Sequence, residues 1–278
     1  MIQYFDHITL VVHELSTAVA AYTRLLGRAP NWRGDHPELG TSAALFGLSN
    51  ALIELVGPRD GQEAEGIRAW LAANGEGLQA LAFGTPDAAS CSATLRERGL
   101  RATPPQDGEA HGADGSRRSY RSVELSPRST RGLAILAVER TDAAQLRGPA
   151  VTDPACVDAL DHVVIRSADL GAALQFYANG FGIRLALDRV VRNTRMLFFR
   201  VGGVTIEVVH DATLGAQDAF AGAAYRVRDI EAAQSRVRAA GFDVSEVRDG
   251  AKPGTRVFTV RDGTCGVPTL ILRDPSRD

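Results

Sequence analysis

The same short series of strand and helix signals occurs four times along the chain, about once per quarter of its 278 residues. Each copy begins with a short apolar strand, continues through a polar turn into an amphipathic helix, and returns through further strands. A chain built from one repeated unit buries its apolar faces by packing the copies on one another. We therefore expect an α+β protein made of four βαβββ modules.

The first and third copies are the most alike. The first copy predicts strands near Phe5–Val12, Ala43–Gly47 and Ala51–Val56, with a helix over about Ser16–Leu26. The third predicts strands at Leu160–Ile165, Arg184–Leu187, Thr194–Val201 and Val204–Val209, with a helix over about Asp169–Asn179. The second and fourth copies open near Leu78 and Ala221, and their helices over 86–98 and 230–240 end at Gly99 and Gly241, which suit a helix C-terminus.

A stretch without periodicity separates the two halves of the chain. Residues 142–158 include Pro149 and Pro154 and carry turn-forming residues. We therefore expect an N-terminal domain over 1–141 with copies one and two, a linker over 142–158, and a C-terminal domain over 159–278 with copies three and four.

Composition and charge exclude several function classes. The chain has 31 basic and 33 acidic residues, a net charge of −2, so the balance indicates no nucleic acid partner. It has no apolar run of 18 residues and no signal-like N-terminus, so we expect a cytoplasmic protein that does not cross a membrane. Its three cysteines, without a CxxC spacing, favour free thiols over a disulfide framework.

One histidine and one glutamate recur in the two similar copies. Glu54 follows His7 by 47 residues, and Glu207 follows His162 by 45. All four lie in apolar, β-branched runs, where an ionised carboxylate without a partner is costly. A divalent metal ion would supply that partner, since imidazole and carboxylate are common ligands of Zn, Ni, Mn and Fe.

Four βαβββ modules, with Asp-His in the first strand and Ile-Glu in the last strand of two of them, resemble the vicinal oxygen chelate superfamily. This superfamily includes glyoxalase I, methylmalonyl-CoA epimerase and extradiol dioxygenases. The resemblance covers residues 4 to 274. It implies that modules pair into two curved, partly open mixed β-sheet barrels, and that one metal ion is held by His7, Glu54, His162 and Glu207. The stretch 34–41 also looks like a loop of glyoxalase-like members.

The second and fourth copies depart from this pattern. Ala80 and Gly222 stand where the first-strand histidine is expected, and Ile135 and Leu270 stand near the carboxylate position. If consecutive modules pair, each barrel holds one His and one Glu. If copies one and three pair, the four residues form a single 2-His-2-Glu site. The sequence leaves both arrangements open.

The function that the resemblance implies is a divalent-metal-dependent lyase or isomerase. It would chelate vicinal oxygens of a small substrate and stabilise an enediolate, with Glu54 or Glu207 as the base. One alternative is an Fe(II)-dependent dioxygenase, and another is a non-catalytic protein that sequesters a small molecule. A homodimer is also possible.

Four further residues are weaker substrate candidates. His36 lies between Asp35 and Pro37, which is more typical of a loop residue. Arg195 and Arg200 flank an apolar run and could hold a substrate carboxylate or phosphate, although a solvated outer face explains them as well. Tyr225, in the first strand of copy four, could line a cavity.

Overall fold

The computed structural model describes residues 1–277, which form two eight-stranded mixed sheets. The first half contains β1 (Tyr4–Val11), α1 (Leu15–Leu26), β2 (Trp32–His36), β3 (Thr41–Gly47), β4 (Leu52–Pro58), α2 (Glu65–Asn74), β5 (Gly77–Gly84), α3 (Ala88–Glu97), β6 (Gln106–Gly112), β7 (Arg117–Glu124), β8 (Ala134–Glu139) and α4 (Ala143–Arg147). Short 3-10 turns lie at Pro37–Leu39 and Gln62–Ala64.

The second half contains β9 (Ala159–Ser167), α5 (Leu170–Leu174), a π-helical turn η3 (Gln175–Gly180), β10 (Arg184–Val191), β11 (Thr194–Val201), β12 (Val204–His210), β13 (Ala219–Arg226), α6 (Ile230–Ala239), β14 (Arg248–Asp249), β15 (Arg256–Val260), β16 (Thr269–Arg273) and a 3-10 turn at Pro275–Arg277. The expected α+β class and the four βαβββ modules are confirmed.

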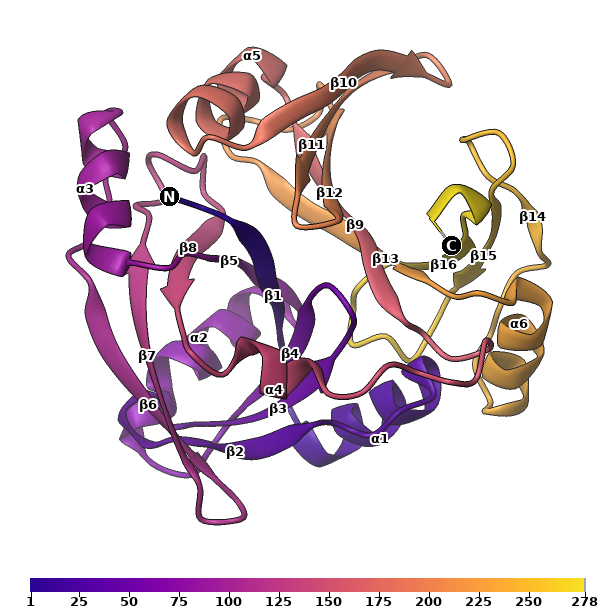
Figure 1. Ribbon diagram of the computed structural model, residues 1–278, viewed down its shortest axis with the longest axis horizontal. Helices are drawn as coiled ribbons and strands as arrows, with labels where there is room; N and C mark the ends of the chain where they lie inside the picture. The colour runs from indigo at the N-terminus through magenta and orange to yellow at the C-terminus, as the bar shows by residue number, and fades with distance from the viewer. Residues whose placement is uncertain (278) are drawn as a thin grey trace.

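Consecutive modules pair in both halves. The strand order β1-β4-β3-β2-β6-β7-β8-β5 closes into a barrel, and the order β10-β11-β12-β9-β13-β16-β15-β14 curls without closing. Within each half the first strands of the two modules pair antiparallel, β1 with β5 and β9 with β13. Figure 1 shows the barrel beside the curled sheet, which stays open between β10 and β14.

Alternation along the strands separates the inside of the barrel from its helix-covered outside. Ile8 and Ile53 belong to the main core together with Val19 and Tyr22 of α1. Leu52 belongs to a smaller cluster with Trp32, Ala43, Leu45, Ala110 and Leu146. Because successive side chains of a strand point to opposite faces, this smaller cluster marks the inner face of the barrel.

The main core is continuous between the halves. Phe83 of β5 and Phe181, which follows η3, meet edge to face with ring centroids 4.9 Å apart. Asn50 joins the halves through the backbone of Leu160, donating from Nδ2 to its carbonyl at 2.8 Å and accepting from its N–H at 3.0 Å. The barrel and the curled sheet therefore share one hydrophobic core.

Three segments differ from the sequence-based expectations. The expected loop over 34–41 begins as the end of β2, because Gly34 and Asp35 pair with both β3 and β6. The expected linker contains α4, whose Leu146 is buried in the inner cluster of the barrel. The expected helix over 169–179 changes to π-helical hydrogen bonding from Gln175 onward.

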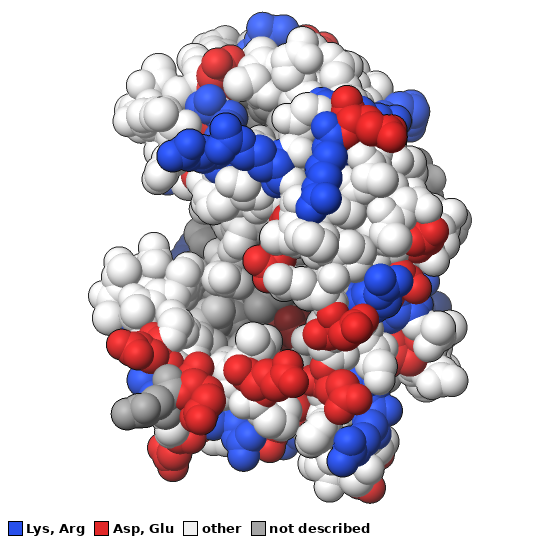
Figure 2. Space-filling view, turned by 90° about the vertical axis from the view of Figure 1, so that its left-hand side faces the viewer, with Lys and Arg blue, Asp and Glu red and all other residues white. Residues whose placement is uncertain are grey.

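The surface carries both signs of charge. In Figure 2, on the side that faces left in Figure 1, Lys and Arg gather in the upper part and Asp and Glu in the lower part. Among the described residues, none of the helices has the length and apolar character needed to span a membrane.

Candidate active site in the first barrel

His7 and Glu54 lie on neighbouring strands of the first barrel. β1 and β4 run parallel, with His7 opposite Leu52 and Thr9 opposite Glu54. All four side chains therefore share the inner face. Thr9 Oγ1 donates a hydrogen bond of 2.9 Å to Glu54 Oε2, and His7 Nε2 lies 3.5 Å from the same oxygen. Both candidates are largely buried, with exposed side-chain fractions of 6% and 16%.

Asp6 orients the His7 ring. The pairing of β1 with β5 shifts register between Phe5 and His7, and such a bulge redirects the side chains beside it. His7 Nδ1 donates to Asp6 Oδ1 at 2.6 Å, and Arg140 Nη2 lies 3.3 Å from that oxygen. Burial alone would raise the pKa of Asp6, but the His7 hydrogen bond and the Arg140 charge bring this pKa below its usual value. This hydrogen bond leaves Nε2 of His7 as the ring nitrogen that faces Glu54.

His36 joins the same carboxylate from β2. Its Nε2 lies 3.9 Å from Glu54 Oε1, and the Tyr120 hydroxyl lies 3.4 Å from its Nδ1. Burial lowers the pKa of His36, so the ring is neutral at pH 7. This residue, a minor substrate candidate by sequence, therefore lies beside the His7–Glu54 pair.

The Glu54 carboxylate is ionised despite its burial. Desolvation would raise its pKa, but the nearby His7 and His36 rings, the Thr9 hydrogen bond and the Arg140 charge hold the pKa of Glu54 below its usual range. An ionised carboxylate on the inner face of a barrel can bind a cation or accept a proton.

The second His–Glu pair repeats the strand register but not the surroundings. His162 of β9 lies opposite Thr205 of β12, two residues before Glu207. Here Nδ1 of His162 is the atom near both carboxylates, 3.0 Å from Asp161 Oδ2 and 3.8 Å from Glu207 Oε1. The pair belongs to the open sheet, so the structure has two separate His–Glu pairs rather than one composite set of four ligands.

The remaining candidates lie elsewhere. Arg195 is exposed and forms a two-bond ion pair with Asp188 of β10, at 3.0 and 2.8 Å. Arg200 is half-buried on β11, opposite Thr205. Tyr225 is fully buried in the core, where desolvation raises its pKa. None of these three contacts Glu54 in the part of the chain that the structure describes.

Two residues that shape this site, Asp6 and Arg140, are not among the candidates predicted from the sequence. Asp6 carried a signal, because the Asp-His pair occurs again as Asp161-His162. Arg140 carried none, since it follows the end of β8 in a module without the His or Glu of the pattern.

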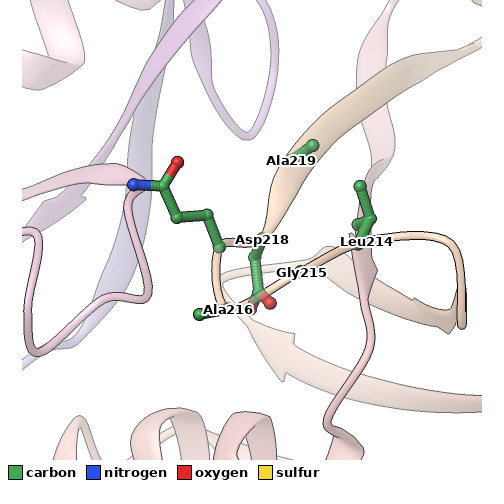
Figure 3. A pocket seen from close by; sticks show the side chains of 6 residues that line it. Leu214, Gly215, Ala216, Asp218 and Ala219 are labelled. Carbon is green, nitrogen blue, oxygen red and sulfur yellow. The ribbon is translucent and has the colours of Figure 1, made fainter.

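Two pockets lie away from this site. One, of about 550 Å³, is formed by the loop 214–219 (Figure 3). The other, of about 510 Å³, lies between the halves, with Trp70, Glu76 and Phe220 among its walls. Asp218, in the walls of both, pairs with Arg131 at 2.9 Å across the halves. No candidate residue of the His–Glu pairs lines either pocket.

The donor chemistry around Glu54 suits a divalent metal ion, although the ligands are few. Within residues 1–277, no group of three or more His, Cys, Asp or Glu side chains is arranged to hold one. His7 and Glu54 supply an imidazole nitrogen whose opposite nitrogen is held by a carboxylate, as is usual for metal-bound histidine, and an ionised carboxylate. Two protein ligands would leave further positions for water, substrate oxygens or His36.

Paired βαβββ modules with His and Glu on adjacent inner strands define a glyoxalase-like fold. The model of the glyoxalase-like domain family matches residues 5–153, and that of the Glyoxalase/Bleomycin resistance protein/Dioxygenase superfamily matches residues 159–276. The chain belongs to this superfamily, also called the vicinal oxygen chelate superfamily.

Two solved structures that match nearly the whole chain support the fold. A 4-hydroxymandelate synthase variant from Streptomyces coelicolor has a TM-score of 0.70 at 15% identity, covering 98% of this chain and 93% of its own. A hypothetical protein from Staphylococcus aureus has a TM-score of 0.66 at 10% identity, covering 99% of both chains. A methylmalonyl-CoA epimerase from Streptomyces coelicolor is 26% identical over 51% of this chain and 96% of its own, with a TM-score of 0.42. No curated protein is a significant match.

Proposed function

We propose that the protein is a divalent-metal-dependent enzyme of the lyase or isomerase type, acting on a small substrate with vicinal oxygens in the first barrel. The observation that supports this proposal is the Asp6–His7–Glu54 arrangement on the inner face. The first barrel is favoured over the second sheet because it is closed, and because it adds His36 to the pair. Enclosure excludes water and strengthens electrostatic interactions with a bound substrate.

The residues of the barrel divide the chemistry among them. His7 and Glu54 would hold the metal ion, which when bound supplies the positive charge that stabilises an enediolate. Glu54 accepts the proton from the substrate carbon, since its carboxylate is ionised, and returns it to the neighbouring atom. Thr9 holds Glu54 Oε2 through its hydroxyl, while the neutral His36 beside Oε1 can receive or supply a proton.

Metal content tests this proposal directly. Elemental mass spectrometry of the protein after reconstitution with Zn²⁺, Ni²⁺, Mn²⁺ or Fe²⁺ should give one metal ion per chain. His7→Ala and Glu54→Gln should lose it. His162→Ala removes the corresponding histidine of the second sheet and should keep it. A wild-type protein that takes up none of the four metals would contradict the proposal and would favour a sequestering protein.

A second candidate function is an Fe(II)-dependent dioxygenase. The specific observation is His36, whose Nε2 lies 3.9 Å from Glu54 Oε1, so that a rearrangement of the His7, His36 and Glu54 side chains would give two histidines and one carboxylate around one ion. That ligand set, with open positions, is typical of non-haem iron oxygenases. Oxygen consumption by the Fe(II)-loaded protein, lost in His36→Ala, would favour this candidate over the lyase or isomerase.

A further inference from the structure

Arg140 brings an unusual group to the first barrel. The residue follows β8, and its side chain is only 6% exposed. One nitrogen, Nη2, lies 3.3 Å from Asp6 Oδ1. The other two, Nε and Nη1, are buried and have no hydrogen-bond partner among the described residues. Buried N–H groups of a charged side chain are costly when unpaired, so native proteins rarely leave them so unless a ligand completes them.

The guanidinium acts on the same groups that form the candidate site. Arg140 Nη2 lies 3.3 Å from Asp6 Oδ1, and the same oxygen accepts the 2.6 Å hydrogen bond from His7 Nδ1. One carboxylate therefore links Arg140 to His7, which places the guanidinium beside the His7–Glu54 pair.

The neighbouring arginine is already paired. Arg118 Nε donates to Asp142 Oδ2 at 2.5 Å, and its guanidinium lies 4.7 Å from the Trp32 ring centroid. The indole Nε1 of Trp32 is itself buried without an acceptor among the described residues. Arg140 and Trp32 thus have buried N–H donors without acceptors among the described residues, which favours a ligand that carries acceptor oxygens.

We propose that Arg140 binds a carboxylate group of the substrate, so that the substrate class of this barrel is a small hydroxy or oxo carboxylic acid. Nη2 carries a second N–H besides the one toward Asp6, so that together with one of the two unpaired nitrogens it can present two parallel N–H groups to the two oxygens of a carboxylate. The inference rests on the proposed function for the place of the substrate, because a divalent ion at His7 and Glu54 offsets the negative charge of Glu54 and allows a second anion beside it.

Binding of matched acids and amides tests this inference. The chain has two tryptophans, so Trp70→Phe leaves Trp32, inside the barrel, as the reporter. Fluorescence titration in this background compares lactate with lactamide and mandelate with mandelamide, with and without Zn²⁺. Each amide keeps the shape of its acid but carries no charge. We expect the Trp70→Phe protein, which retains Arg140, to bind at least one of the two acids about tenfold more tightly than the matching amide.

Three variants separate recognition from stability. Arg140→Gln should bring the acid-to-amide ratio to about one, and Arg140→Lys, which keeps the charge without the planar fork, should retain part of it. Arg121→Gln removes a half-exposed arginine of β7, paired with Asp107 and Glu139, and should leave the ratio unchanged. A purely structural role for Arg140 would lower the unfolding midpoint of Arg140→Gln without changing this ratio.

The outcomes also distinguish this inference from the proposed function. Equal affinity for acids and amides in the wild type, or no response to any probe, would overturn the inference, as would an Arg140→Gln variant that keeps the preference. Zinc content is measured on the same samples. A preference for acids without bound metal would support the carboxylate site and contradict the metal-dependent function, while bound zinc without a preference would do the reverse.

Discussion

At the scale of single residues, one hydrogen bond decides which nitrogen of His7 faces Glu54. Asp6→Asn keeps the size of the side chain but removes the charge that fixes the proton on Nδ1. We expect the affinity for the metal to fall about 10- to 100-fold, the usual loss for a partner of a metal-bound histidine. Competition with a chromogenic chelator measures this affinity. Asp161→Asn, the same change beside His162, should leave it unchanged, and equal losses in both variants would contradict the assignment.

Repetition is what made His7 and Glu54 predictable from the sequence. Each is unusual in an apolar strand, and each recurs in the third module at nearly the same spacing. The sequence could not show the other site residues, because they are brought together by barrel closure. His36 reaches Glu54 only because β2 pairs with β3, which in turn pairs with β4. Arg140 reaches Asp6 from a module that lacks the repeated pattern.

At the scale of secondary structure elements, α4 covers the inner cluster of the barrel. Its Leu146 packs with Trp32, Ala43, Leu45 and Leu52. Leu146→Ala should lower the free energy of opening of α4 by about 2–5 kcal/mol, because truncation of a buried leucine leaves a cavity. Hydrogen exchange of the amides in 143–147 measures this opening.

The matched control for this prediction is Leu39→Ala. Leu39 is 58% exposed, so its truncation should leave exchange in α4 unchanged. Faster exchange throughout the barrel in Leu146→Ala, rather than in α4 alone, would show that Leu146 supports the whole barrel and not a separate cover.

The strands and helices with strong periodicity were predictable, and the weaker ones were not. α6 (Ile230–Ala239) and β11 (Thr194–Val201) agree with the expected ranges to within one residue. α2 and β6 are not among the elements predicted from the sequence. β6 consists largely of polar residues and Gly and has only Ala110 buried, so its place in the barrel depends on pairing with β2 and β7 rather than on an apolar pattern.

At the scale of the whole molecule, the shared core should make the two halves unfold together. Phe181 is fully buried against Phe83 of the other half and stacks on Phe176 of its own, with centroids 5.5 Å apart. We expect Phe181→Ala to destabilise the protein by about 3–5 kcal/mol. Urea unfolding followed by the fluorescence of Trp32 and Trp70, both in the first half, and by circular dichroism should still give coincident transitions, since the contact is common to both halves.

Leu187→Ala serves as the control for this prediction. Leu187 is 44% exposed on β10, and its loss should change stability little. A Phe181→Ala protein whose barrel retains wild-type stability, while only the curled sheet loses structure, would show that the halves are independent.

The pairing of modules was open in the sequence because the repeated pattern of strands and helix does not specify which copies pair. Copies one and three are alike in sequence, but antiparallel pairing of β1 with β5 and of β9 with β13 joins neighbours along the chain. Short connections favour such neighbours. Similarity between copies therefore indicated common chemistry and not contact in space.

The position of α4 has a consequence for dissecting the molecule. The chain passes from the barrel to the curled sheet by way of α4, which covers the inner cluster of the barrel, so the connection between the halves is also part of the first half. A fragment ending at residue 141 would lack α4 and expose Trp32 and Leu45 to solvent. A fragment ending at residue 153, where the match to the glyoxalase-like domain family ends, would retain α4 and keep these residues covered. A truncation before α4 would therefore leave the inner apolar cluster of the barrel exposed to solvent. A soluble fragment of the first half requires that the chain be cut after α4.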